Sequence, residues 1–114
     1  MKRVTPEQLT QKACVPCRGG MPPLTAEQAR EYHAAVPAWT LSADATRISR
    51  EFKLKDFQQA MAFVNRVADL AEAEQHHPDI AIHWNRVELV LWTHAIGWLH
   101  ENDFVMAAKV DQLR

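Results

Sequence analysis

Histidines concentrate in one short part of this sequence, and their positions could support acid/base chemistry. Five of the six histidines fall between His76 and His100. His76 and His77 occupy an expected helix-to-strand connection, and His94 stands at the expected end of a strand. Rigid scaffolds commonly present reactive groups at such positions. Because imidazole titrates near neutral pH, we regard these three residues as candidate general acids and bases.

The other two histidines of this stretch have structural interpretations. His83 alternates with the apolar residues of an expected strand, which favours a position on the surface of a sheet. His100 lies just before the expected last helix, near its cap. A His-His-Pro turn taken alone is also more often a surface loop than a catalytic site, so the functional hypothesis depends on the spacing of the whole set.

Cys14 and Cys17 have the spacing of metal ligands, but a closed zinc site needs four ligands and the sequence holds no second cysteine pair. His76, His77 or His83 could complete such a site only if the N-terminal segment folds back. We therefore expect no metal. Two cysteines in one cluster do not form a disulfide framework either, which favours a reducing cytoplasm.

The elements that must position the histidines can be read from caps and hydrophobic periodicity. Residues 1–23 form an expected N-terminal arm, because prolines and glycines interrupt any long pattern. Within the arm, only residues 5–12 have the pattern of a short helix. Thr25 and Gln28 then form a capping box, and helical spacing continues until Pro37.

A long helix is the most regular element of the sequence. Asp56 opens it, and Gln59 completes a second capping box. It should end near Gln75, because Pro78 disfavours helical backbone just before it. The expected buried face consists of Phe57, Ala60, Met61, Val64, Val67, Ala68 and Ala71.

Four short segments alternate between apolar and polar residues and predict strands. Two are joined by a turn at 42–45 and two by a turn at Asn85-Arg86, so each pair must be antiparallel. Gly97 interrupts the pattern, and a last helix follows up to about Leu113. The expected strands are 39–41, 48–54, 80–84 and 87–91.

The order helix, strand, strand, helix, strand, strand, helix predicts an α+β fold, with a four-stranded antiparallel sheet and the helices on one face. The other face is left for solvent or a partner subunit. Val90 and Trp92 lie on the opposite side of their strand from Leu89 and Leu91, so this strand is expected to be buried on both sides. That pattern favours a homo-oligomer.

Length and composition narrow the class of protein. A chain of 114 residues should form one domain, here residues 24–114 after the arm. A formal net charge of -1 gives no basic excess for phosphate-backbone binding, so no direct nucleic-acid partner is expected. No apolar run predicts a membrane span or a secretion signal, and we expect a cytoplasmic protein.

Taken together, these residues resemble a known signature. Glu72 is followed by His76-His77-Pro78, then at fixed spacing by Trp84, His94 and Asp103. This series resembles the signature of the pterin-4a-carbinolamine dehydratase family, whose members are also known as dimerisation cofactors of homeodomain transcription factors. Trp39, Phe57, Ala60 and Phe63 also match, and the resemblance covers about residues 21–114.

The resemblance implies dehydration of a 4a-hydroxytetrahydropterin, the product left by aromatic amino-acid hydroxylases. It assigns His76 and His94 to an acid/base pair on the hydroxyl and His77 mainly to orienting the pterin. Asp103 is expected to support His94, and Glu72 to hold the substrate edge or tune His76. Substrate binding is assigned to Trp39, Pro78 and Thr93, and no metal or organic cofactor is implied.

Alternative interpretations accompany several of these assignments. Asp103 could be only a carboxylate favoured by the dipole of the last helix, and Glu72 could be a solvated helix residue. Trp39 could belong to the core or to the pocket wall. The family's usual Asp, Gly and Thr after His94 are replaced by Ala95, Trp98 and His100.

The resemblance also implies partners. A homodimer or a homotetramer is expected, and an aromatic amino-acid hydroxylase or another protein could bind. The alternative to the enzyme is a non-catalytic interaction module on the same fold, acting as a transcriptional coactivator, hydroxylase regulator or assembly factor.

Overall fold

The computed structural model describes residues 4–15 and 21–113. Cys17 and the remainder of 16–20 in the predicted arm lie outside the described residues, as do 1–3 and 114. Four antiparallel strands form one sheet in the order β1-β2-β4-β3. In chain order the elements are α1 (Pro6–Thr10), α2 (Ala26–His33), β1 (Thr40–Leu41), β2 (Ile48–Lys53), α3 (Phe57–Glu74), β3 (Asp79–His83), β4 (Arg86–Leu91) and α4 (Glu101–Asp111).

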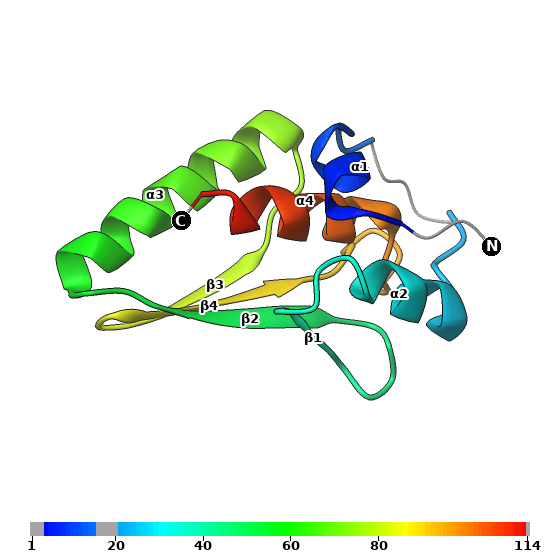
Figure 1. The fold of residues 1–114 in the computed structure, drawn as a ribbon, viewed down its shortest axis with the longest axis horizontal. Coiled ribbons are helices and arrows are strands. Elements are labelled where there is room, and N and C mark those ends of the chain that lie inside the picture. Colours follow the sequence, from blue (N-terminus) through cyan, green and yellow to red (C-terminus); the bar gives the residue numbers. More distant parts are fainter. Residues whose placement is uncertain (1–3, 16–20, 114) are drawn as a thin grey trace.

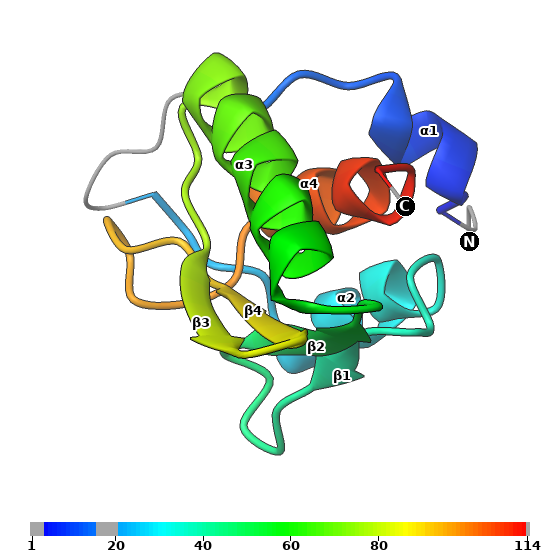
Figure 2. The same ribbon diagram turned by 90° about the vertical axis from the view of Figure 1, so that its left-hand side faces the viewer.

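One face of the sheet carries the core. Residues of β2 and β4 alternate, so that Ile48 and Phe52 lie on the same buried side as Val87, Leu89 and Leu91. Helices α3 and α4 lie over this face, and α1 packs on α4 (Figures 1 and 2). The predicted α+β architecture is confirmed.

The opposite face of the sheet is more polar than predicted. Glu88 is exposed and Val90 is half-buried, because both point away from α3 and α4. The expected burial of this strand on both sides is therefore absent from the described chain. Homo-oligomerisation stays a prediction.

The hairpin between β3 and β4 turns one residue earlier than predicted. Its two turn residues are Trp84 and Asn85, and Arg86 already belongs to β4. Trp84 takes a φ of 53°, since a two-residue hairpin turn needs positive φ to match the twist of its strands. Trp84 is thus an exposed turn residue, with 64% of its surface accessible, and not the last residue of the strand.

Helix α3 begins and ends where the sequence indicates. The Asp56 carboxylate accepts the Gln59 backbone N–H, which is one half of the predicted capping box, and the helix ends at Gln75 in the left-handed conformation. Its buried face differs, however: Phe63 is fully buried whereas Phe57 is 50% exposed. The other buried positions are Ala60, Val67 and Ala71. Packing against the sheet sets the rotation of the helix about its axis, and periodicity alone did not fix it.

The described part of the predicted arm is docked on the domain. Thr5 caps α1 with Pro6 in the first turn, and Leu9 is fully buried. The Asn102 side chain donates to the Val15 carbonyl at 2.7 Å and accepts the Val15 N–H at 3.0 Å. These contacts fasten the arm to the start of α4, while the domain boundary at residue 23 remains a prediction.

The two remaining helix starts also follow the sequence. The capping box of Thr25 and Gln28 is present in both directions, and α2 ends at His33, ahead of Pro37. His100 is the N-cap of α4, as its position predicted. In the described ranges, no helix combines the length and the apolar character that crossing a membrane requires.

Candidate active site

The three predicted histidines converge on one cleft. His76, His77 and His94 line a cavity of about 170 Å³ together with Gln75, Trp92, Thr93 and Ala95. The first two come from the connection between α3 and β3, and the third follows β4. Because β3 and β4 are neighbours in the sheet, the two segments meet at the same end of the hairpin.

Local backbone geometry presents these side chains. Gln75 ends α3 with φ 55°, and the His76 N–H still reaches the carbonyl of Ala71 at 3.2 Å. After β4, the chain makes a tight loop in which the N–H groups of Ile96 and Gly97 both bond the carbonyl of Thr93. Gly97 has φ 70°, which favours glycine at this position. His94 lies in this loop, and its side chain is about half exposed to solvent.

His76 is paired with a buried carboxylate. Its Nε2 lies 2.6 Å from Oδ1 of Asp103, with the histidine 8% exposed and the aspartate fully buried. The other oxygen, Oδ2, accepts the Thr93 hydroxyl at 2.8 Å and the His100 N–H at 3.0 Å. Three donors thus surround a carboxylate removed from water, which fixes its orientation and that of the imidazole.

The predicted partnership between Asp103 and His94 is wrong. Asp103 is the third residue of α4 and points inward to His76, while His94 is 51% exposed and lies nearest to Asp79, with 3.8 Å from Nε2 to Oδ1. The alternative reading of Asp103 as a helix-start carboxylate holds at the same time, because its Oδ2 closes the capping box with His100.

Glu72 also has a different neighbour from the one expected. Its Oε2 lies 2.5 Å from Nε2 of His77, and both side chains are exposed. Helical geometry explains this, since Glu72 is close to the end of α3 and the reversal at Gln75 brings His77 back along the helix. Each of the three cleft histidines therefore has its own carboxylate.

Trp39 belongs to the core and not to the cleft. It is 1% exposed, its indole N–H bonds Oδ1 of Asp111 at 2.9 Å, and its ring meets Phe52 edge-on. Of the two other predicted substrate-binding residues, Thr93 lines the cleft. Pro78 is half-buried beside it and is not among the lining residues.

Trp92 and Asp79 were not predicted as site residues. The Trp92 ring centroid lies 4.0 Å from that of His94, and its Nε1 donates to Oδ2 of Asp79 at 2.9 Å. The sequence signal was available: residues two positions apart in extended chain point to the same side, so Trp92 shares a side with His94.

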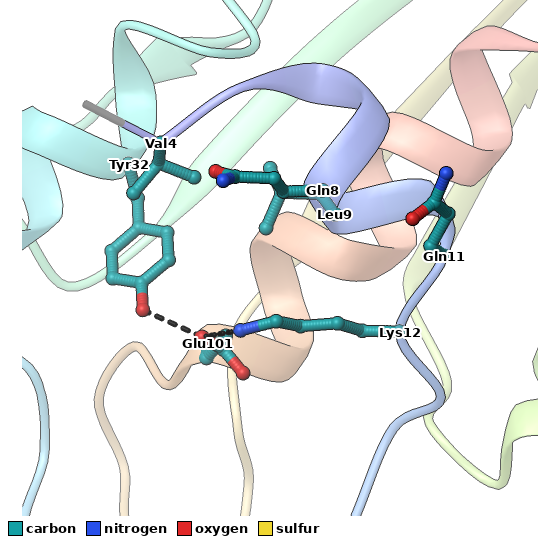
Figure 3. Close-up of a pocket in the computed structure, with 7 residues that line it drawn as sticks. All are labelled: Val4, Gln8, Leu9, Gln11, Lys12, Tyr32 and Glu101. Atoms are coloured by element: carbon teal, nitrogen blue, oxygen red, sulfur yellow. Dashed lines mark hydrogen bonds and ion pairs between the residues drawn. The ribbon is translucent and has the colours of Figure 1, made fainter. Parts of the chain in front are cut away.

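A second, larger hollow lies between α1, α2 and α4, with a volume of about 530 Å³. Figure 3 shows the Tyr32 hydroxyl and the Lys12 ammonium meeting at Glu101, at 2.6 and 2.8 Å from the same oxygen. None of the described residues lining it is a histidine. Since Tyr32, Lys12 and Glu101 already bond one another, we place the chemistry in the smaller histidine cleft.

Cys14 is not part of a candidate metal-binding group in the part of the chain that the structure describes. There, no group of three His, Cys, Asp or Glu side chains is arranged to hold a metal ion. Burial, reinforced by the negative charge of Glu74, raises the pKa of the Cys14 thiol to about 12. A thiol in this state is a poor nucleophile and a poor ligand at neutral pH.

Comparison with known proteins identifies the family of this chain. The profile described as pterin 4 alpha carbinolamine dehydratase matches residues 22–113. The chain belongs to this family. Two relatives provisionally named pterin-4-alpha-carbinolamine dehydratases, from Methylococcus capsulatus and Halorhodospira halophila, are each 51% identical over 105 residues. These alignments cover 92% of this chain and 92% and 96% of the relatives.

Solved structures of the pterin dehydratase type share the fold. A protein from Brucella melitensis described as a transcriptional coactivator/pterin dehydratase has a TM-score of 0.76 and 34% identity, covering 81% of this chain and 98% of its own. A pterin dehydratase-like protein described as a RuBisCO assembly factor has a TM-score of 0.58 and 26% identity, covering 67% and 88%.

Proposed function

We propose that this protein dehydrates 4a-hydroxytetrahydropterin (pterin-4a-carbinolamine) to quinonoid dihydropterin and water. The observation that carries the proposal is the convergence of His76, His77 and His94 on one cleft, each beside a carboxylate, in a member of the pterin-4a-carbinolamine dehydratase family. The wider role would be to recycle the pterin cofactor of aromatic amino-acid hydroxylases, in a homodimer or homotetramer.

The reaction needs one proton delivered and one removed. The hydroxyl on C4a leaves as water after it gains a proton, the N5 lone pair forms the new double bond to C4a, and a ring N–H proton is lost to a base. We assign these transfers to His76 and His94, because both line the cleft and imidazole exchanges protons readily near neutral pH. His77, exposed at the rim and held by Glu72, would orient the pterin.

The surroundings of His76 suit it to hold a charge during the reaction. Its Nε2 faces Asp103, which leaves Nδ1 as the ring atom for exchange with the substrate. A buried carboxylate behind an imidazole fixes its orientation and stabilises the imidazolium form. The exposed His94 would exchange its proton with solvent between turnovers.

The test is an assay with chemically generated 4a-hydroxytetrahydropterin. Purified protein should accelerate its dehydration, and His76→Ala and His94→Ala should each lower the rate by roughly 10²-fold or more. His83→Ala serves as the matched control, because His83 is an exposed histidine on β3 that does not line the cleft. Circular dichroism checks that the variants fold. A rate no higher than the uncatalysed one in the unmodified protein would reject the proposal.

A second candidate function is a non-catalytic interaction module. It is favoured by the description of one structural neighbour as a RuBisCO assembly factor and of another as a transcriptional coactivator. A pull-down separates the two functions: a variant lacking all three cleft histidines that still retains a specific partner, an aromatic amino-acid hydroxylase for example, supports the module. Failure to retain any specific partner argues against it.

A further inference from the structure

Trp92 occupies the centre of a contact chain that ends at His94. On one side, the Arg47 guanidinium lies 3.8 Å from the centroid of its ring. On another, its N–H bonds Asp79, and its ring packs edge-on against the His94 imidazole at a centroid distance of 4.0 Å. One side chain therefore touches a cation, a carboxylate and a candidate catalytic base.

Asp79 uses its two oxygens for two different neighbours. Oδ2 accepts the indole N–H of Trp92 at 2.9 Å, and Oδ1 lies 3.8 Å from Nε2 of His94. The bond from Trp92 limits rotation of the carboxylate, so that its free oxygen faces the imidazole. Asp79 is therefore the carboxylate that faces the exposed histidine, at ion-pair distance and without the direct hydrogen bond that Asp103 makes to His76.

Arg47 connects Trp92 to the loop that carries His94. Besides stacking on Trp92, its Nη1 donates to the carbonyls of Thr46 at 2.9 Å and Gly97 at 3.2 Å. A planar guanidinium that stacks and donates at once has one favoured orientation. The indole and the loop are therefore held relative to each other by one side chain.

These contacts can restrict the imidazole of His94, as burial restricts that of His76. Half of the His94 surface is exposed, so core packing does not restrict its imidazole rotamers. A proton-transfer group must nevertheless be held close to its productive geometry. We propose that Trp92 and Asp79 are positioning residues for His94: Trp92 confines the imidazole and aims Asp79, and Asp79 stabilises the imidazolium that forms when His94 takes a proton. This inference rests on the proposed dehydratase function.

Three variants test separately the Trp92 ring, its N–H group and the charge of Asp79. Trp92→Leu removes the ring, Trp92→Phe keeps a ring but removes the N–H, and Asp79→Asn keeps an acceptor for the indole but removes the charge. Glu88→Gln is the matched control, since Glu88 is an exposed carboxylate on β4 that does not line the cleft.

With the dehydratase assay, Trp92→Leu should lower kcat about tenfold while KM changes by less than about twofold. Trp92→Phe should lower kcat less than Trp92→Leu does, and Glu88→Gln should leave kcat unchanged. Asp79→Asn should also lower kcat, because the imidazolium that forms on His94 during the reaction loses the carboxylate that faces it. A raised KM with unchanged kcat in Trp92→Leu would assign Trp92 to binding the substrate ring and overturn the positioning role.

A second measurement does not depend on activity. In the imidazole NMR spectrum, the His94 signals, assigned by their loss in His94→Ala, should carry a ring-current shift that persists in Trp92→Phe and disappears in Trp92→Leu. Unchanged His94 signals in Trp92→Leu overturn the inference even if the enzyme is active. Absence of dehydratase activity in the unmodified protein would reject the proposed function, while this spectrum still decides whether Trp92 holds His94.

Discussion

The Nε2 atom of His76 lies 2.6 Å from Oδ1 of Asp103, and this contact joins the end of α3 to the first turn of α4. Both residues are buried, so water competes little for their hydrogen bond. The same carboxylate also holds Thr93 and closes the cap of α4. A single buried group therefore links the orientation of a candidate catalytic imidazole to the packing of the last helix.

Replacing Asp103 with asparagine should affect both rate and stability. One of the positions now occupied by oxygen would carry an NH₂ group, which clashes with a donor from His76, Thr93 or His100. We expect the dehydration rate to fall on the order of 100-fold. The free energy of unfolding, measured with urea, should fall by about 1–3 kcal/mol. Asp69→Asn, at an exposed position of α3, is the control and should change neither; a fully active Asp103→Asn enzyme would contradict the role of this contact.

Glu74 should make the stability of the protein depend on acid pH. A hydrogen bond from the Cys14 backbone N–H, assisted by Lys109, lowers the pKa of Glu74 from its ordinary value of 4.5. A carboxyl whose pKa is lower in the folded than in the unfolded state stabilises the fold above its unfolded pKa, and this contribution is lost as pH falls through the folded pKa.

The measurement compares urea unfolding of the unmodified protein and Glu74→Gln at several pH values. At neutral pH the variant should be less stable by about 1–2 kcal/mol. The difference should shrink as the pH falls below the ordinary pKa of the carboxyl. A difference that stays constant from neutral to acid pH would mean that the charge of Glu74 is not its source.

The Cys14 thiol should react slowly. Because burial and Glu74 raise its pKa to about 12, almost none of it is thiolate at mildly alkaline pH. In a Cys17→Ser background, alkylation by iodoacetamide at about pH 8 should be roughly 10²–10³-fold slower than in the same protein unfolded in urea. Adding Glu74→Gln should speed the reaction. Equal rates in the folded and unfolded protein would show that the arm is not docked as the structure describes.

Tyr32 provides a spectroscopic test of the hollow between α1, α2 and α4, since it is the only tyrosine in the sequence. Burial, together with its hydrogen bond to Glu101, raises the pKa of the phenol to about 12. Phenolate absorbance should therefore appear with a midpoint near that value, provided circular dichroism shows the protein still folded. In Glu101→Gln the midpoint should move down, because the negative acceptor is removed. An unmoved midpoint would leave Glu101 without influence on the phenol.

Several features of the fold were predicted from short-range signals. Thr25, Asp56 and His100 mark helix starts because a cap is satisfied by the residues that follow it within one turn. The end of α3 near Gln75 and the two hairpins likewise depend on a few neighbouring residues. The signals failed where the outcome depended on rotation or register: Phe63 replaced Phe57 on the buried face, and Trp84 took the turn position expected of Asn85.

The sequence by itself determined the element order, the family signature and the gathering of three histidines at element ends, since these follow from residue type and local spacing. Only the tertiary structure decided which carboxylate serves which histidine. Asp103 reaches His76 because α4 packs on the sheet, and Asp79 faces His94 because β3 lies beside β4. Glu72 reaches His77 through the local reversal of the chain at Gln75, whose left-handed conformation the spacing of the sequence did not predict. Hydrogen bonds are effective over about 3 Å, and a distance of that size between residues far apart in the chain is fixed by packing and not by spacing along the sequence.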